Sequence, residues 1–315
     1  MKSVRWGLIG AGWIATKAIA PAIHAAAGSV VQAVASRDLE RSQRLNPVTV
    51  HESYSALLED PSIDAVYISL PNNFHCEWTL KALAAGKHVL CEKPFAMNAI
   101  EVQSMMEAAT KHDRLLVEAM ASRWHPRMAR MVDYVRSGNI GEIISIDSSF
   151  TFPASLEGNY RISEGMGGGA LFDVGVYQIH AAIALLGDNA LPNIESCDVK
   201  VGETGVDLTT KWRINFNDSI STSGLASFEM PEAQSLTVHG EKNLVELLGE
   251  QVFTSWRSPS LLKLGEQIEE FVAVDPYMLM IENFSKKVRG EDGWVIPLET
   301  SLSVLKIVDQ LIAHK

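Results

Sequence analysis

The stretch VRWGLIGAGWIA, residues 4–15, decides the fold class. An apolar run at residues 4–9 ends in the pattern G-x-G-x-x-G/A, formed by Gly10, Gly12 and Ala15 with Trp13 and Ile14 between them. This pattern is typical of a strand, a tight glycine turn and the start of a helix, whose free N–H groups attract a pyrophosphate. A tight turn that binds no ligand would carry similar glycines, but the strand and helix in register with them favour dinucleotide binding.

Short apolar strands alternate with helices through the first part of the chain. Strands are expected at residues 30–35, 65–70, 88–91 and 115–118, and helices at residues 12–27, 75–85 and 98–112. This alternation indicates an α/β fold with a doubly wound parallel sheet that is covered on both faces. We therefore expect residues 1–122 to form a Rossmann domain.

The second part of the chain has a different pattern. Strands rich in Val, Thr and Ser are expected at residues 143–152, 195–201, 208–216, 220–228, 234–239 and 244–248, and helices at residues 170–186, 277–289 and 300–314. Such segments predict a large, mostly antiparallel sheet that is open on one face. We expect residues 123–315 to form this second α/β domain.

The composition excludes several classes of protein. The chain has 315 residues, of which 47% are hydrophobic and 21% charged, as in a globular protein of about two domains. A net charge of −11 disfavours nucleic acid and anionic membranes as partners. With three widely spaced cysteines, no secretion signal and no membrane span near the start, we expect a cytoplasmic protein.

Ser36-Arg37-Asp38, at the end of the second strand, bears on the choice of cofactor. An acidic residue at this point would accept hydrogen bonds from both ribose hydroxyls and favour NAD. Ser36 is uncharged, and Arg37 can pair with a 2′-phosphate, so we expect NADP. An inward-facing Asp38 would still allow NAD, and Arg37 could instead be a solvated surface residue.

A polar loop follows the strand at residues 65–70, at the sheet edge where ligands bind. We assign five of its residues to the cofactor site, namely Leu70, Pro71, Asn72, Asn73 and His75. The asparagines could hydrogen-bond ribose hydroxyls, although Asn73 could instead cap the next helix.

Glu92-Lys93-Pro94 follows the next strand at the same edge. A lysine held there by a proline turn is placed to donate to a substrate hydroxyl and to stabilise a developing oxyanion. An ordinary surface ion pair between Glu92 and Lys93 is the alternative.

The apolar helix at residues 170–186 carries Asp173 and Tyr177 one turn apart, on one face. Because buried polar groups are costly, these two residues either satisfy each other or line a site. The glycines before them allow close approach of a ligand or of backbone. His180 is a reserve acid or base, with a packed core histidine as the alternative.

We expect no metal site. His88 and Cys91 have an H-x-x-C spacing, but on a strand these two side chains point to opposite faces.

Six motifs occur in order along the chain. They are residues 10–15, PNNFH at 71–75, EKP at 92–94, RWHP at 123–126, YRI at 160–162 and GGGALFDVGVY at 167–177. Together they resemble the glucose-fructose oxidoreductase / inositol dehydrogenase / MocA family, most of all its branch with dimeric dihydrodiol dehydrogenases and xylose dehydrogenases.

The resemblance implies a site and an assembly. Lys93 matches the catalytic lysine of the family, and Asp173 and Tyr177 match its D-x-x-x-Y/H pair. Glu92 and Arg123 are expected at the cofactor, and the substrate pocket is expected to include Trp124, Tyr160, Arg161 and His180. Arg161 could bind an anionic group or pin a loop. The second domain is expected to form a homodimer or homotetramer through its sheet, and the Lys93–Pro94 peptide is expected to be cis.

The expected reaction is reversible hydride transfer between nicotinamide and a sugar, a cyclic polyol or a trans-dihydrodiol. Tyr177 would exchange the hydroxyl proton, with its pKa lowered from about 10 by the Lys93 ammonium. Asp173 would orient the substrate or tune Lys93. The alternatives are a dinucleotide-dependent sensor without turnover and an NAD-dependent glycosidase of the same family.

Overall fold

The structure, a computed structural model, describes residues 3–155, 158–217 and 219–314 and divides into two compact units. The first unit consists of Met1–Ala121 and Asp275–Ser301, and the second of Ser122–Val274 and Leu302–Lys315. This division differs from the expected one, which placed all residues after 122 in the second domain. The difference lies in the segment Asp275–Ser301, which returns to the first unit.

Helix α8 (Pro276–Val288) explains why that segment belongs to the first unit. It packs against α1 (Ala20–Ala25), and the ring of Phe284 lies 4.9 Å from that of Trp6. Ser285 and Ser29 share a hydrogen bond of 3.0 Å between their hydroxyls. Both aromatic side chains are fully buried, so α8 completes the core of this unit.

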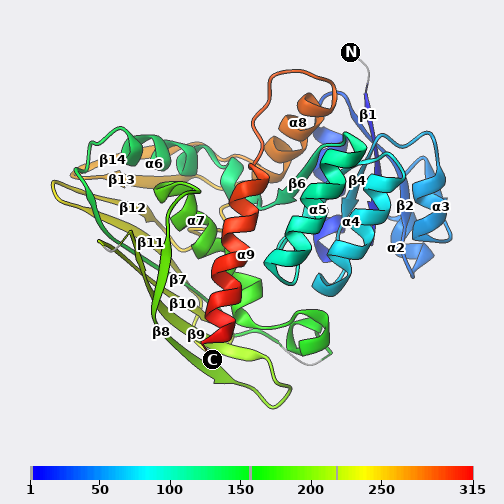
Figure 1. Cartoon of the computed structure of the whole chain (residues 1–315). Coiled ribbons are helices and arrows are strands. Elements are labelled where there is room, and N and C mark those ends of the chain that lie inside the picture. Colours follow the sequence, from blue (N-terminus) through cyan, green and yellow to red (C-terminus); the bar gives the residue numbers. More distant parts are fainter. Residues whose placement is uncertain (1–2, 156–157, 218, 315) are drawn as a thin grey trace. The chain divides into compact units, whose positions relative to one another are not determined.

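The first unit contains a six-stranded sheet in the order β3-β2-β1-β4-β5-β6 (Figure 1). Its strands are β1 (Val4–Ile9), β2 (Ser29–Ala35), β3 (Thr49–His51), β4 (Ala65–Ile68), β5 (His88–Glu92) and β6 (Leu116–Ala119). Every pair is parallel. All residues of β4 are buried although neighbours face opposite sides, so the sheet is covered on both faces. The predicted Rossmann fold is confirmed.

Helices connect these strands. They are the π-helical turn η1 (Ala15–Ile19) with α1, α2 (Leu39–Gln43), α3 (Tyr54–Glu59), the short 3-10 turn η2 (Asn72–Phe74), α4 (His75–Ala84) and α5 (Ala99–His112). The strand order reverses between β1 and β4, so the loops that follow these strands flank the point where ligands bind in such folds.

The second unit contains an eight-stranded sheet in the order β14-β13-β12-β11-β7-β10-β9-β8. Its strands are β7 (Ile143–Thr151), β8 (Pro192–Val201), β9 (Asp207–Phe216), β10 (Ile220–Ser227), β11 (Ala233–Gly240), β12 (Leu244–Leu248), β13 (Ser260–Leu264) and β14 (Gln267–Phe271). Only the β7–β10 pair is parallel among the pairs of the described strands in this sheet, which confirms the expected mostly antiparallel sheet.

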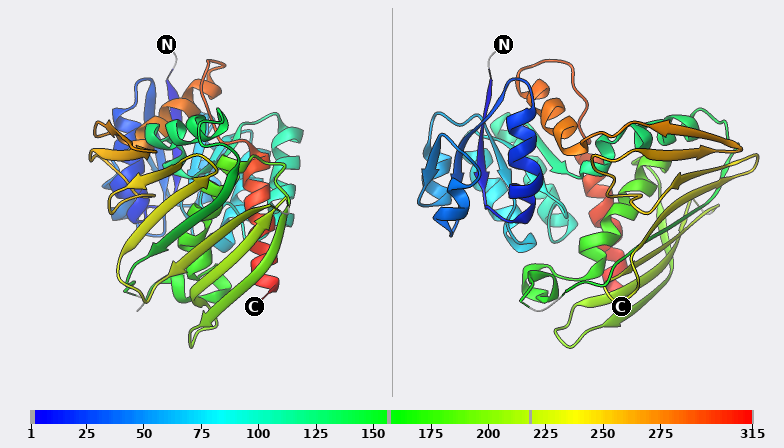
Figure 2. Two further views of the ribbon diagram at one scale, coloured as in Figure 1. Left: turned by 90° about the vertical axis from the view of Figure 1, so that its left-hand side faces the viewer. Right: turned by 180° about the vertical axis from the view of Figure 1, so that it is seen from behind.

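Helices lie on one face of this sheet. The turn η6 (Leu171–Gly175), which is π-helical, and α7 (Val176–Leu186) pack on β7, β9 and β10, and α6 (Pro126–Arg136) packs on β13. The strands lie in front of α7 in the left view of Figure 2. Along β9, the buried residues Trp212 and Ile214 alternate with the exposed residues Lys211 and Arg213. The second face of the sheet is therefore open, as expected.

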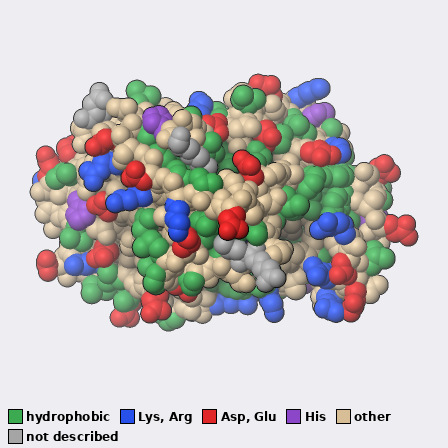
Figure 3. All heavy atoms as spheres, turned by 90° about the horizontal axis from the view of Figure 1, so that it is seen from below, with side chains coloured by type: hydrophobic (Ala, Val, Ile, Leu, Met, Phe, Trp, Pro, Cys, Tyr) green, Lys and Arg blue, Asp and Glu red, His purple; other side chains and the backbone are tan. Residues whose placement is uncertain are grey.

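The remaining elements are the 3-10 turns η3 (Ala121–Trp124), η4 (Tyr160–Ile162) and η5 (Glu164–Met166), and α9 (Leu298–Ala313). The helical run Glu164–Leu186 has the length and hydropathy of a membrane span, but 89% of its most apolar 18-residue stretch is buried inside the protein, as in a core helix. Acidic and basic side chains are interspersed over the face shown in Figure 3.

Candidate active site

The glycine turn after β1 has the geometry of a pyrophosphate cradle. Gly10 has a φ of +98°, and a Cβ there would lie 2.8 Å from the Ser69 carbonyl oxygen, so only glycine fits. No atom lies within 4 Å of a Cβ built on Gly12, which leaves room for a ligand beside the backbone. Ala15 is fully buried beneath the helix, Ile14 is half-buried and Trp13 is 68% exposed. The turn therefore fits the cofactor that the fingerprint implies.

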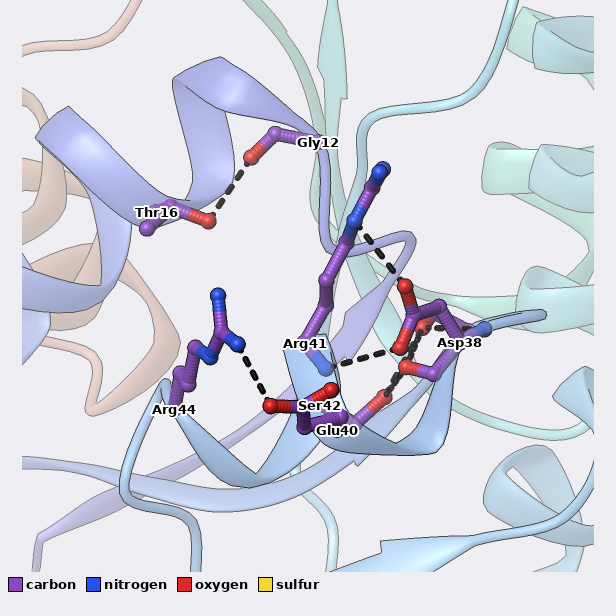
Figure 4. A network of polar contacts seen from close by, with 8 residues as sticks. Gly12, Thr16, Asp38, Glu40, Arg41, Ser42 and Arg44 are labelled. Carbon is purple, nitrogen blue, oxygen red and sulfur yellow. Dashed lines mark hydrogen bonds and ion pairs between the residues drawn. The ribbon is translucent and has the colours of Figure 1, made fainter.

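At the end of β2, the Asp38 side chain caps the start of α2 (Figure 4). Its carboxylate accepts a hydrogen bond from the Arg41 backbone N–H at 3.0 Å and pairs with Arg41 Nε at 3.0 Å. The Ser36 hydroxyl donates to the Asp38 carbonyl at 2.6 Å and lies 2.9 Å from the Ser42 hydroxyl. Because the Asp38 charge is offset by Arg41, and Arg37 is exposed, this edge favours a 2′-phosphate.

Sequence reasoning missed two further arginines of this edge. Arg41 and Arg44 rise from α2 on the side of the Gly12 turn in Figure 4. Arg44 Nη2 is ion-paired with Glu40 at 2.5 Å. The signal in the sequence is the run of three basic residues, Arg37, Arg41 and Arg44, at helical spacing.

His75 ties together the loops that follow β4 and β5. One ring nitrogen, Nδ1, lies 2.8 Å from the Pro94 carbonyl oxygen, and the other, Nε2, lies 2.9 Å from that of Leu70. The ring is fully buried, and this burial lowers its pKa, although both carbonyls oppose the effect. His75 therefore holds these two loops together, and its predicted role at the cofactor stays a prediction.

The two asparagines of the same loop, Asn72 and Asn73, lie in different environments. Asn72 is 4% exposed, and Pro71 beside it is half-buried. Helix α4 has Phe74 at its N-cap position with no side-chain cap bond, so the capping alternative for Asn73 is wrong. The Asn73 Oδ1 atom is buried and has no hydrogen-bond partner among the described residues. An acceptor of this kind fits a ribose hydroxyl donor.

Glu92 and Lys93 occupy the carboxyl end of β5. The Glu92 carboxylate accepts hydrogen bonds from the Tyr67 hydroxyl and, at 3.2 Å, from the Lys93 backbone N–H. Burial raises the pKa of Glu92 to about 7, although Tyr67 and the Lys93 charge oppose this. The Lys93–Pro94 peptide is cis, as expected, and Lys93 is half-buried. Glu92 thus fixes the backbone of Lys93.

In the second unit, the glycines before η6 leave room for the backbone at Arg161 and for the carboxylate of Asp207. A Cβ on Gly168 would lie 2.3 Å from the Arg161 carbonyl oxygen, and one on Gly169 would lie 2.1 Å from Asp207 Oδ1. The other Asp207 oxygen accepts the Leu171 N–H at 2.8 Å and so caps the helix. Because these glycines have no side chain, the Tyr160–Ile162 turn can pack closely against the start of the helix.

That turn brings Arg161 to Asp173. Arg161 Nε donates to Asp173 Oδ2 at 2.7 Å, and the Asp173 side chain is only 9% exposed. Burial lowers the pKa of Arg161, but Asp173, with smaller contributions from Tyr160 and Tyr177, raises it overall above its usual range. The guanidinium also lies 5.1 Å from the centre of the Tyr160 ring. Arg161 pins its loop to the helix that carries both predicted site residues.

Tyr177 is half-buried beside two phenylalanines that sequence reasoning did not identify. Its ring lies 5.5 Å from that of Phe150 on β7 and 6.2 Å from that of Phe253. Tyr177 and Phe253 also line a pocket that includes Arg123, whose Nη1 donates to the His180 carbonyl at 3.4 Å. Tyr177 is therefore a lining residue of this pocket, with its ring packed against Phe150 and Phe253.

Two other predicted substrate residues lie in the core. The His180 side chain is fully buried, and Trp124 is 6% exposed. Tyr177 and Arg123 therefore line the pocket, whereas the side chains of His180 and Trp124 are buried and are not among the residues that line it.

The sequence analysis assigned no role to His125, which belongs to the RWHP segment, or to Arg127, which directly follows that segment. His125 caps α6, because its Nδ1 accepts the Arg127 N–H at 3.2 Å. Arg127 is 2% exposed, and its guanidinium donates to four carbonyl oxygens, those of Leu248, Gln251, Val252 and Leu261. The proline after His125 was the available signal, since proline favours the first turn of a helix.

Among the residues that the structure describes, no group of three His, Cys, Asp or Glu side chains is placed to hold a metal ion. The Nδ1 atom of His88 accepts the Leu115 N–H at 2.9 Å.

Two family models match the chain. Residues 4–120 match the oxidoreductase family with an NAD-binding Rossmann fold, and residues 128–246 match the GFO/IDH/MocA C-terminal domain. A D-xylose 1-dehydrogenase (NADP(+)) from Haloferax volcanii is 30% identical over 97% of this chain and 95% of its own length. The trans-1,2-dihydrobenzene-1,2-diol dehydrogenase of Mus musculus is 30% identical over 85% of this chain and 80% of its own.

The fold has a close structural relative. KijD10, a 3-ketoreductase from Actinomadura kijaniata solved with NADP and TDP-benzene, superposes with a TM-score of 0.91 at 29% identity, covering 99% of this chain and 98% of that one. The two family models together match most of the chain, and the likeness to KijD10 extends over its full length. This chain therefore belongs to the Gfo/Idh/MocA family of nicotinamide-dependent oxidoreductases.

Proposed function

We propose that the protein is an NADP-dependent oxidoreductase that transfers a hydride between nicotinamide and a hydroxyl or carbonyl carbon of a sugar, a cyclic polyol or a trans-dihydrodiol. The observation that carries this proposal is the presence of Lys93 after β5 and of Tyr177 in the lining of a pocket, within the two matched family regions. The relatives named for D-xylose and for a dihydrodiol support the substrate range.

In this proposal the residues divide the work. Bound NADP supplies or accepts the hydride. Lys93 donates to the reacting oxygen and stabilises negative charge on it, while Tyr177 takes or returns the hydroxyl proton. Asp173, held by Arg161 at 2.7 Å, orients the substrate hydroxyl. Glu92 positions Lys93 through the 3.2 Å bond to its backbone N–H.

The test is nicotinamide absorbance with NADP+ or NADPH and a panel of sugars, polyols and dihydrodiols. We expect turnover of at least one class, and a loss of roughly 10²- to 10⁴-fold in kcat for Lys93→Met and for Tyr177→Phe, since each removes a proton or charge partner. Rates near wild type in both variants would contradict the assigned roles. Dinucleotide binding without turnover of any compound would instead indicate a sensor, and release of sugar with no net absorbance change would indicate a glycosidase.

The cofactor preference has its own test. Arg37→Ala is expected to raise KM for NADP+ by about 10-fold or more and to leave KM for NAD+ nearly unchanged, because only NADP carries the 2′-phosphate. An equal change for both cofactors would show that Arg37 does not contact that phosphate.

The division of labour and the assembly are also part of the proposal. The first unit would bind NADP, and the second would bind substrate and form a homodimer or homotetramer through the open face of its sheet. A cytoplasmic setting agrees with three cysteines that form no disulfide, Cys76, Cys91 and Cys197. Light scattering of the purified protein tests the assembly, and a monomer at micromolar concentration would contradict it.

A further inference from the structure

The pocket at Tyr177 is small and has a polar wall. It is lined by Tyr177, Arg123, Ser122, His125, Phe253 and Ser255, among others, all from the second unit. Its free space has room for about one water-sized group. A single oxygen-bearing group of a ligand is therefore the largest occupant that fits without movement of the walls.

His125 has one defined tautomer in this pocket. Its Nδ1 accepts the Arg127 backbone N–H at 3.2 Å, so the proton of the neutral ring is on Nε2. Burial, helped by the nearby Arg127 charge, lowers the pKa of His125 to about 4, so the ring is neutral at pH 7. His125 therefore presents an N–H donor at Nε2.

That donor is buried without a counterpart. His125 is 3% exposed, and its Nε2 has no hydrogen-bond partner among the described residues. A buried donor left unsatisfied is costly, so an acceptor that reaches it is bound favourably. Arg127 does not compete for such an acceptor, because its guanidinium is occupied by backbone carbonyls.

Only an acceptor fits this position. A hydroxyl or carbonyl oxygen satisfies the Nε2–H, whereas an ammonium group has no lone pair to offer and would meet the Arg127 charge. Tyr177, in the proposed function, already acts on the reacting oxygen of the substrate. The oxygen that His125 would bind is therefore a second one.

We propose that His125 is a specificity-determining residue whose Nε2–H binds a second oxygen of the substrate, next to the one on which Tyr177 acts. This inference rests on the proposed function and deepens it. The enzyme selects substrates with two neighbouring oxygens, as in a sugar, a polyol or a diol, over simple alcohols and ketones.

Two substitutions separate this role from helix capping. His125→Asn keeps an acceptor at the position of Nδ1, and asparagine is a favoured N-cap, but it has no atom at the position of Nε2. His125→Gln places an amide N–H near the position of Nε2 but lacks the capping acceptor. If His125 has only a structural role, His125→Asn should behave like wild type and His125→Gln should be impaired. If His125 binds substrate as proposed, His125→Asn should have the higher KM for substrate and His125→Gln should have a KM closer to that of wild type.

The kinetic probes are D-xylose and its 2-deoxy analogue, each with NADP+. For His125→Asn we expect KM for D-xylose to rise roughly 5- to 100-fold, with an unchanged urea midpoint and little change for the 2-deoxy analogue. His125→Gln should keep KM closer to wild type at a lower urea midpoint. An unchanged KM in His125→Asn, while wild type oxidises D-xylose, overturns the inference and leaves the proposed function intact.

A second measurement needs no turnover. Long-range ¹⁵N–¹H NMR of histidine-labelled protein, with His125 assigned by difference from His125→Asn, should show a neutral ring with its proton on Nε2 at pH 7. A ring protonated on Nδ1, or charged at pH 7, overturns the inference whatever the substrate is. Failure of wild type to turn over any sugar, polyol or diol refutes the proposed function itself.

Discussion

The buried carboxyl of Glu92 makes the stability of the first unit depend on pH. Its pKa is raised from the usual 4.5 to about 7, mainly by burial. Between these values the folded state holds a proton that the unfolded state has released. The contribution of Glu92 to stability is therefore complete below pH 4.5 and is lost as the pH rises through about 7. At about 1.4 kcal/mol for each unit of pKa, the difference between 4.5 and about 7 corresponds to about 3 kcal/mol.

Glu92→Gln tests this reasoning, because the amide has nearly the same shape but does not ionise. The Tyr67 hydroxyl and the Lys93 N–H donate to different oxygens of Glu92, so the single amide oxygen keeps one of these two bonds, and the loss of the other is the same at every pH. Urea unfolding at pH 5, 6, 7 and 8 should show wild type losing about 2.5 kcal/mol more than the variant across this range, because part of the effect is already lost at pH 5. Glu77→Gln, at an exposed position of α4, is the matched control and should retain the wild-type slope. Parallel pH profiles for wild type and Glu92→Gln would refute the assigned burial cost.

Two further predictions concern the second unit. Arg127→Met removes the donor from the buried carbonyls that Arg127 binds, two of them at 2.7 Å. The free energy of unfolding should therefore fall by about 2–5 kcal/mol. A loss below about 1 kcal/mol in urea titration would contradict this expectation. Gly169→Ala combines a φ of +117° with a Cβ only 2.1 Å from Asp207 and should cost more than 2 kcal/mol, whereas Gly138→Ala, at φ +77° with open space around it, should cost only about 1 kcal/mol. Equal thermal midpoints for the two alanine variants would show that the Asp207 contact is not the cause.

The fold was predictable where the sequence pattern is local. The glycine turn and β1 lie within twelve consecutive residues, and α7 is apolar almost throughout, so their environment shows in their composition. Helix α2 and strand β3 were not predicted, because five and three residues carry too little periodicity to stand out. Strands β13 and β14 were also not predicted, because each has only five residues. Their formation depends more on pairing with neighbouring strands than on a local strand preference.

The site was predictable only in its motif residues. Lys93, Asp173 and Tyr177 belong to recognisable local sequence motifs. The residues that contact the side chains of Asp173 and Tyr177 come from other parts of the chain. Phe253 contacts the Tyr177 ring from 76 residues further along, and no spacing rule links the two. His125 was quoted within a motif, but its function depends on which ring nitrogen the Arg127 N–H occupies, and only coordinates reveal that.

The return of α8 to the first unit affects how the chain is made. During synthesis, Trp6 is among the first residues to leave the ribosome, yet the ring that covers it, Phe284, follows some 278 residues later. A nascent chain of 122 residues therefore holds all six strands of the parallel sheet while one side of its core is still exposed to water. Expression of that fragment alone should yield an aggregation-prone product, and an isolated nucleotide-binding module needs residues 275–301 joined back to it.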